Sequence, residues 1–370
     1  MKLFRSTAVV LALLGLILGL AACGSKMFEN DNSKDMLMRE SIDRYFSMEK
    51  KNKIKIGFSV ASFQEERWLT DRDIFVARCN ELGGEVIVQS ANGDENLQVE
   101  QCRKLLNQNI DVLVIIPQDS EKAAVIVNEA NKLSIPVVAY DRLIRNCSVD
   151  AHVTNDNIRI GELQAEALVS KVPKGNYILL GGAQTDYCAI QIKEGQMNVL
   201  KPYIDKGDIR IVEEKWVEDW NPFVARKIIE NALAASNNIQ AVMAPNDGTA
   251  GGVIQALAEK KLAGKVAVSG QDADLAGCQR IVEGTQSMTV YVPIKAEAEG
   301  GAEVAIKLAK GEKFDGNITI YNGKIPVPTL LLPPISVDKE SIVDTVIRDG
   351  YQKFEEVFKN IPKDKWPPQK

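Results

Sequence analysis

The stretch Ile135-Pro136-Val137-Val138-Ala139-Tyr140-Asp141-Arg142 decides how the rest of the chain is interpreted. It is a short apolar run that begins beside a proline and ends in an acid and a base, a pattern typical of a buried parallel strand. The pattern returns in Lys265-Val266-Ala267-Val268-Ser269-Gly270-Gln271-Asp272. A preceding apolar run is repeated as well, in residues 112–119 and 241–247. The sequence therefore predicts two similar α/β units.

Each half of the chain alternates apolar runs with helical patterns of about 10–15 residues, which predicts βαβ units and parallel sheets. We expect an α/β fold with two similar doubly wound parallel-sheet lobes that a multi-strand hinge joins. Ligands of open α/β sheets bind at the carboxyl ends of the strands. Two such ends that face each other would form a cleft between the lobes.

The expected division of the chain follows from these repeats. Crossings between the lobes are predicted near Thr154, near Pro293, and between Tyr321 and Thr329. The predicted segments are a signal peptide (1–22), a tether (23–53), an N-terminal lobe (54–154 and 294–325), a C-terminal lobe (155–293 and 326–362) and a disordered tail (363–370).

Composition and charge narrow the classes of function. The chain has 370 residues, of which 45% are hydrophobic and 26% charged, and its net charge of -5 gives no support for nucleic-acid binding. The single histidine, His152, gives no basis for a His-based metal site or proton relay. We therefore expect no metal, no cofactor and no nucleic-acid partner.

The N-terminus has the features of an export signal. Lys2 and Arg5 precede an apolar segment over residues 8–20, which is too short for a typical membrane span. The following Leu20-Ala21-Ala22-Cys23-Gly24 resembles a bacterial lipobox, in which the cysteine is lipidated. We expect Cys23 to anchor the protein on the outer face of the cytoplasmic membrane. Five cysteines remain, so not all of them can pair within the chain, and no two form a CxxC motif. Their disulfide state stays open.

No common catalytic motif is found, since GxxxxGK[ST], a GxGxxG after a strand, HExxH and GxSxG do not occur. The polar and aromatic side chains that follow the predicted strands suit a polyol ligand instead. Charged groups and amides bind sugar hydroxyls, and aromatic faces pack on the apolar faces of a sugar ring. These candidate residues are Trp68, Asp141, Arg142, Trp220, Asn246 and Asp272.

Longer stretches resemble the ribose-binding-type periplasmic binding proteins of bacterial ABC sugar transporters, over about residues 54–351. The stretches that carry the resemblance are Glu66-Arg67-Trp68, Asp71-Arg72-Asp73-Ile74-Phe75-Val76, Val88-Gln89-Ser90-Ala91-Asn92-Gly93, Ala139-Tyr140-Asp141-Arg142, Gly161-Glu162-Leu163-Gln164-Ala165, Gly195-Gln196-Met197, Ser269-Gly270-Gln271-Asp272-Ala273-Asp274-Leu275-Ala276-Gly277 and Gly284-Thr285-Gln286.

The resemblance implies roles for individual residues. Trp68 and Trp220 would sandwich the sugar ring. The residues that would hydrogen-bond the sugar are Arg67, Asp141, Arg142, Asn246 and Asp272.

Two sites depart from the family's pattern. Tyr187 and Cys188 replace a pair of asparagines, of which the second contacts the sugar in the family. Val292 replaces a sugar-contacting lysine. These departures leave the identity of the sugar open, while the sugar site itself is expected.

The combined interpretation is a monomeric, lipid-anchored binding protein, not an enzyme, that delivers D-xylose or a related aldose to the membrane subunits of an ABC permease. One alternative is a receptor that reports sugar occupancy to a membrane sensor kinase. A sugar-responsive repressor shares the lobes but needs a DNA-binding helix pair where this chain has an export signal. A sugar isomerase or epimerase would need a metal cluster or a paired acid and base, neither of which stands out.

Overall fold

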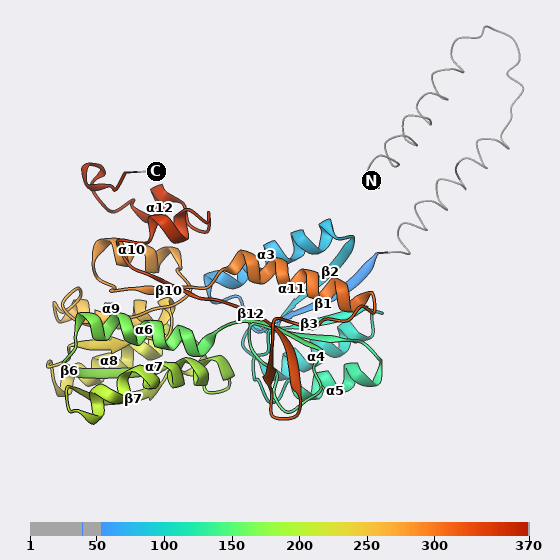
Figure 1. Ribbon diagram of the computed structural model, residues 1–370, viewed down its shortest axis with the longest axis horizontal. Coiled ribbons are helices and arrows are strands. Elements are labelled where there is room, and N and C mark those ends of the chain that lie inside the picture. The colour runs from blue at the N-terminus through green and yellow to red at the C-terminus, as the bar shows by residue number, and fades with distance from the viewer. Residues whose placement is uncertain (1–38, 40–52, 369–370) are drawn as a thin grey trace, which may run out of the picture. The chain divides into compact units, whose positions relative to one another are not determined.

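A computed structural model describes Arg39 and residues 53–368 of the chain. The expected signal peptide, Cys23 and nearly all of the expected tether lie outside the described residues. The chain from Ile54 onward forms one compact unit, and this unit contains two lobes (Figure 1). Within the described part of the chain, no helix combines the length and apolar character needed to cross a membrane.

The first lobe is built on a seven-stranded sheet with the order β11-β12-β5-β4-β3-β1-β2. Neighbouring strands are parallel except for the antiparallel pair β11 and β12. The strands are β1 (Ile54–Val60), β2 (Gly84–Ser90), β3 (Val112–Ile115), β4 (Val137–Tyr140), β5 (Ala151–Asn155), β11 (Ile318–Tyr321) and β12 (Pro326–Leu332).

Helices cover both faces of this sheet, which explains why β3 and β4 are buried at every position. Val112 and Val114 of β3 pack into the core beneath α3 and α11, and Leu113 and Ile115 pack into the core on the opposite face, beneath α4 and α5. The helices are α3 (Glu66–Glu81), α4 (Glu95–Leu106), α5 (Ala124–Lys132) and α11 (Ile294–Ala309).

The second lobe repeats this plan. Its parallel sheet has the order β7-β6-β8-β9, which matches the order β2-β1-β3-β4 of the first lobe. Helices α6 and α7 cover one face, and α8 and α9 cover the other. The elements are α6 (Asn157–Lys171), β6 (Gly175–Gly181), α7 (Tyr187–Asp205), β7 (Ile209–Trp216), a 3-10 turn (Glu218–Trp220), α8 (Pro222–Ala235), β8 (Ala241–Met243), α9 (Asp247–Glu259) and β9 (Ala267–Val268).

A smaller layer completes the second lobe. Strands β10 and β13 pair antiparallel, and α10 packs with the C-terminal segment around a separate apolar cluster. The elements are α10 (Leu275–Glu283), β10 (Thr289–Tyr291), β13 (Ile335–Val337), a π-helical turn (Val343–Ile347), α12 (Phe354–Val357) and a 3-10 turn (Lys363–Lys365).

The chain crosses between the lobes at three places, and the third differs from the prediction. The first crossing follows β5, which ends at Asn155, and the second lies between β10 and α11. We expected residues 326–362 to belong to the second lobe. Strand β12 instead pairs with β5 in the first sheet, so the chain crosses after Leu332. The apolar run of β12 suits either sheet, and only its pairing decides the lobe.

The expected disordered tail at 363–370 is also wrong in its first half. Trp366 packs on Phe354 and Phe358, with ring centroids 5.4 and 6.4 Å away, and its indole N–H donates to the carbonyl of Ile361 at 2.8 Å. Burial of this aromatic ring fixes a segment that its prolines alone mark as irregular. Residues 369–370 lie outside the described residues.

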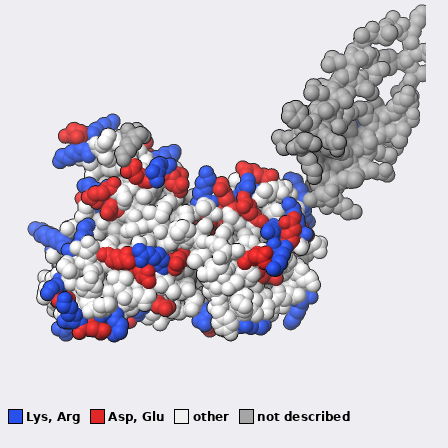
Figure 2. Space-filling view, in the orientation of Figure 1, with Lys and Arg blue, Asp and Glu red and all other residues white. Residues whose placement is uncertain are grey.

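Charged side chains of both signs are interspersed over both lobes on the face shown in Figure 2. Several form exposed ion pairs, such as Arg159 with Glu162 and Glu166 at 2.9 and 2.7 Å. Pairs of this kind contribute little to stability, because water screens them and both side chains lose freedom. The buried ion pairs of the chain include those that link the two lobes.

Candidate functional site

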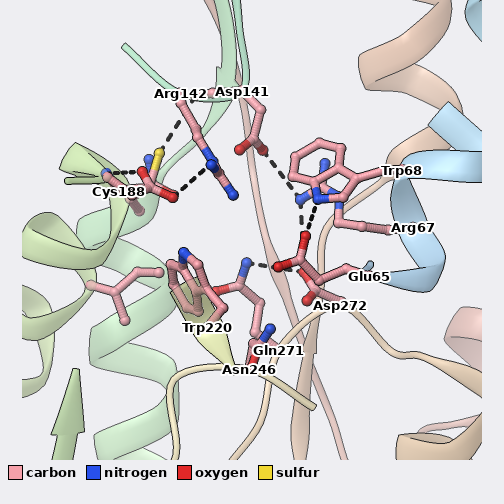
Figure 3. A pocket seen from close by; sticks show the side chains of 13 residues that line it. Glu65, Arg67, Trp68, Asp141, Arg142, Cys188, Trp220, Asn246, Gln271 and Asp272 are labelled. Atoms are coloured by element: carbon pink, nitrogen blue, oxygen red, sulfur yellow. Dashed lines mark hydrogen bonds and ion pairs between the residues drawn. The ribbon is translucent and has the colours of Figure 1, made fainter. Parts of the chain in front are cut away.

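A cavity lies between the two lobes, at the carboxyl ends of the strands (Figure 3). All seven predicted ligand-binding residues line this cavity. From the first lobe come Glu65, Arg67, Trp68, Asp141 and Arg142, and from the second lobe come Asn157, Asp186, Cys188, Ile192, Trp220, Asn246, Gln271 and Asp272.

The strand ends explain why these side chains meet. Arg67 and Trp68 lie in the first turn of α3, close behind β1, and Asp141 and Arg142 directly follow β4. The second lobe supplies most of its residues from the segments that follow β6, β7, β8 and β9. Because the two lobes have the same topology, their strand ends face each other across one cavity.

Three cavity residues have a left-handed backbone although none is glycine. Their φ angles are 60° at Asp141, 55° at Trp220 and 95° at Asp272. Such conformations cost of order 1–3 kcal/mol each and are found mainly where function requires them. At Asp141 the turn is held through its carbonyl oxygen, which accepts from Thr154 Oγ1 at 2.7 Å and lies 3.1 Å from His152 Nε2.

Arg67 is the centre of a buried network of carboxylates. Its guanidinium lies 3.2 Å from Asp141 and 3.7 Å from Asp272, so it joins an acid of the first lobe to an acid of the second. Asp71 at 3.3 Å and Glu297 at 2.9 Å hold its other edge. Burial would lower the pKa of Arg67, but these carboxylates outweigh burial and raise its pKa well above the usual value.

Arg142 forms a second bridge between the lobes. Its Nε lies 2.8 Å from an oxygen of Asp186, and its Nη1 donates to the carbonyl of Pro117 at 3.2 Å. The guanidinium carbons of Arg67 and Arg142 lie 4.3 and 5.6 Å from the centroid of the Trp68 ring. These contacts fix the orientation of the indole, because a cation over an aromatic face is attracted to it.

The second lobe presents amides and an acid to the cavity. The Oδ1 of Asn246 accepts from the Thr249 backbone N–H at 2.9 Å in a capping box at the start of α9, which leaves the Nδ2 of Asn246 for the cavity. Gln271 donates to Asp272 at 3.1 Å. Burial raises the pKa of Asp272 to about 7, although Arg67 acts in the opposite direction.

The two tryptophans stand on opposite sides of the cavity, Trp68 from the first lobe and Trp220 from the second (Figure 3). In the part of the chain that the structure describes, the buried indole nitrogen of Trp220 has no hydrogen-bond partner. An unpaired buried donor is costly, so this N–H calls for an acceptor in the cavity. The arrangement can therefore hold a flat, polar ring between two aromatic surfaces.

Contacts around the rim close the lobes over the cavity. The backbone N–H of Ser120 donates to the carbonyl of Thr185 at 2.9 Å, and Glu66 accepts from the N–H of Leu275 at 3.3 Å. The cavity has a volume of about 30 Å³ for the centres of water-sized spheres. On this measure a single water needs about 10–15 Å³, so the closed cavity is small. A larger ligand thus requires the lobes to separate before it can enter.

A family model described as a periplasmic binding protein domain matches residues 56–313. The chain belongs to the periplasmic binding protein family. It is 50% identical over 305 residues to the D-xylose-binding periplasmic protein of Escherichia coli (strain K12), which covers 82% of this chain and 92% of that protein. It is 29% identical over 327 residues to a multiple sugar-binding periplasmic receptor of Rhizobium radiobacter, with coverage of 82% and 92%.

Solved structures of the family agree with the fold. A carbohydrate transporter solute binding protein from Chloroflexus aurantiacus, in complex with D-glucose, matches with a TM-score of 0.78 and 28% identity. The match covers 82% of this chain and 98% of that protein. The predicted fold class, with two similar doubly wound lobes, is confirmed.

The three residues predicted as departures from the family lie in different surroundings. Cys188 lines the cavity, and its Sγ donates to the carbonyl of Asp141 at 3.6 Å. Tyr187 lies outside the cavity lining, where its ring contacts Arg145 with a guanidinium-to-centroid distance of 4.5 Å. Val292 is fully buried in the apolar core of the second lobe and does not line the cavity.

Five cavity residues were not predicted from the sequence. Asp186 and Gln271 follow β6 and β9, so the strand-end reasoning that found Asp272 could also have found them. Glu65, in the loop before α3, carries no such signal. The remaining two are Asn157 and Ile192 of α6 and α7. The five cysteines of the described chain are free and buried.

Proposed function

We propose that this protein captures a monosaccharide, D-xylose or a related aldose, in the cavity between its lobes. The observation that carries the proposal is the pair of opposed rings, Trp68 and Trp220, with charged groups and amides around them. A pyranose has apolar C–H faces and a rim of hydroxyls. Aromatic surfaces suit the faces, and charged or amide groups suit the rim.

The residues divide into donors and acceptors for such a ring. Arg67, Arg142 and Asn246 supply N–H donors, and Asp141 and Asp272 supply carboxylate acceptors. Every hydroxyl can both donate and accept, so this mixture can satisfy several hydroxyls at once. Because the groups come from both lobes, a bound sugar would add contacts that hold the lobes together.

The relatives support this class of ligand. The E. coli relative is named for D-xylose, and the Chloroflexus aurantiacus structure contains D-glucose. Both are binding proteins rather than enzymes, and the chain belongs to their family. We extend the binding role to this chain, with delivery of the sugar by a monomer to the membrane subunits of an ABC permease.

Hinge closure would couple binding to delivery. The chain crosses the hinge three times, and closure around a ligand is a known response of two-lobed binding proteins. The sugar adds contacts in the closed form only, so it shifts the equilibrium toward closure. A permease that recognises the closed form would then receive loaded protein.

Calorimetric titration of the purified protein with a panel of pentoses and hexoses tests the proposal. We expect saturable binding of one sugar per chain for at least one aldose. The variant Trp220→Ala should weaken that binding at least tenfold, because it removes one wall of the site. Absence of binding for every sugar would refute the function.

We also propose that Cys23 carries a lipid anchor on the outer face of the cytoplasmic membrane. The support is the lipobox-like Leu20-Ala21-Ala22-Cys23-Gly24, which lies outside the described residues. Cys23→Ala should leave the protein unprocessed or move it from the membrane to the soluble exported fraction. A processed variant that stays on the membrane would contradict the anchor.

The second candidate function is a sugar receptor that signals to a membrane sensor kinase. The Rhizobium radiobacter relative is named a receptor, which favours this alternative. The two functions differ in the partner and share the site. Deletion of the gene should abolish uptake of the sugar if the protein serves a permease, and should abolish sugar-dependent transcription with uptake intact if it serves a kinase.

A further inference from the structure

Glu65 is a cavity residue whose side chain does not cap its own helix. It is the N-cap residue of α3, yet its side chain makes no capping hydrogen bond. The carboxylate instead turns to the cavity and accepts from the indole N–H of Trp68 (Figure 3). Burial raises the pKa of Glu65, and Arg142 opposes this rise. A partly desolvated carboxylate thus faces the same space as the two tryptophan rings.

Carboxyl groups outnumber guanidinium groups around this space. Two guanidiniums, Arg67 and Arg142, line the cavity, and both already contact carboxylates there. Arg67 must also neutralise Asp71 and Glu297 behind it. The four carboxylates that line the cavity are Glu65, Asp141, Asp186 and Asp272.

A separate observation also points to a ligand rich in hydrogen-bond donors. The Oε1 atom of Gln271 is buried without a hydrogen-bond partner among the described residues, and the residue is only 8% exposed. The Nε2 atom of the same amide is committed to Asp272, so the free oxygen can be satisfied only by a donor. An unpaired buried acceptor carries the full desolvation cost, which a donor in the cavity would remove.

We propose that the cavity favours an amino sugar, an aldose with an ammonium group in place of one hydroxyl, and that Glu65 is the carboxylate that selects it. This inference rests on the proposed sugar-binding function. An ammonium offers three donors and a positive charge, whereas a hydroxyl offers one donor and no charge. Charge-assisted hydrogen bonds are about twice as strong as neutral ones, and the surplus of carboxylates increases the difference.

Titration calorimetry near pH 7 tests this preference in the wild-type protein. The probes are D-glucose, D-glucosamine, 3-amino-3-deoxy-D-glucose, 6-amino-6-deoxy-D-glucose and N-acetyl-D-glucosamine, together with D-xylose and 2-amino-2-deoxy-D-xylose. We expect at least one amino sugar to bind at least tenfold more tightly than its hydroxyl parent. N-acetyl-D-glucosamine should show none of the extra affinity that D-glucosamine shows over D-glucose, because an amide carries no charge.

The variant Glu65→Gln assigns the preference to Glu65, since it keeps the shape and removes the charge. The ratio of amino-sugar to parent affinity should fall at least tenfold. Asp73→Asn is the matched control, because Asp73 is an exposed acid of the same helix that pairs with Arg72. That control should leave the ratio unchanged.

Three results separate the two levels of the argument. If neutral sugars bind and no amino sugar binds more tightly, the inference is overturned while the sugar site stands. If the preference survives in a folded Glu65→Gln variant, the role of Glu65 is overturned. If neither neutral nor amino sugars bind, the proposed function fails, and the inference fails with it.

Discussion

Asp272 is the acid that links the second lobe to the buried Arg67, and its removal is the sharpest test of the site. The residue is 3% exposed, and its carboxylate lies 3.7 Å from Arg67 Nη1 and accepts from Gln271 at 3.1 Å. Asp272→Asn is the better substitution, because Asn adopts a left-handed backbone more readily than Ala does. The change keeps the shape of the side chain and removes the charge.

The expected loss follows from the kind of hydrogen bond that is lost. A hydrogen bond to a charged group contributes roughly 1.5–3 kcal/mol, and a neutral one roughly 0.5–1.5 kcal/mol. The difference is about 1–1.5 kcal/mol, so Asp272→Asn should weaken sugar binding about five- to tenfold. The melting temperature should hold or rise, because the variant relieves a carboxylate that burial holds at a pKa of about 7.

Calorimetric titration of the wild type and the variant with the same aldose gives the ratio directly. Asp205→Asn is the control, since Asp205 is an exposed acid of the same lobe whose partner is Lys201. The control should bind the sugar with unchanged affinity. Unchanged affinity in a folded Asp272→Asn protein would place the sugar elsewhere and refute the reasoning.

Three further changes test other parts of the molecule. Val292→Lys should destabilise the protein by about 3 kcal/mol or more in urea unfolding, because it buries an unpaired ammonium. Cys188→Asn adds a hydrogen-bond donor at the cavity and should raise the affinity for D-xylose about two- to tenfold, with little change in stability. Burial lowers the pKa of His152 from 6.5 to about 4. In this pH range the folded state binds fewer protons than the unfolded state, so the free energy of unfolding should fall as pH falls from 6.5 toward 4. His152→Gln should show a shallower dependence of that free energy on pH. Identical slopes in the two proteins would contradict the lowered pKa of His152. Gly161→Ala places a methyl group 1.9 Å from a backbone carbonyl of α7 and should lower stability by about 1–3 kcal/mol, and a melting temperature equal to wild type would show that the two helices can separate freely.

The duplicated strand pattern was sufficient to predict the two-lobed fold, because buried parallel strands are recognisable as apolar runs. The sheet to which β12 belongs was not predictable, since Val327 and Leu330 could be buried equally well in either lobe. Its pairing with β5 is a contact between residues far apart in sequence. The ordered conformation of the segment around Trp366 was missed for a similar reason. The residues on which its ring packs lie outside that segment, so the segment's own sequence does not reveal them.

The candidate site was predictable mainly where a polar residue closely follows a strand. Asp141, Asn246 and Asp272 lie one, three and four residues after β4, β8 and β9, and the structure brings them to one cavity. Glu65 was missed because its side chain could have capped α3 or faced solvent. Val292 is a different case, because a resemblance gives only a position in the chain. The packing next to β10 places this side chain in the apolar core of the second lobe.

A crystal structure of the protein grown with a saturating aldose tests the central claim most directly. D-xylose is the first choice, and the tightest sugar from the titration panel is the second. The account predicts a sugar ring between Trp68 and Trp220, with its hydroxyls at Asp141, Asn246 and Asp272. A sugar bound anywhere else, or a cleft without sugar in crystals of a protein that binds it in solution, would contradict the account.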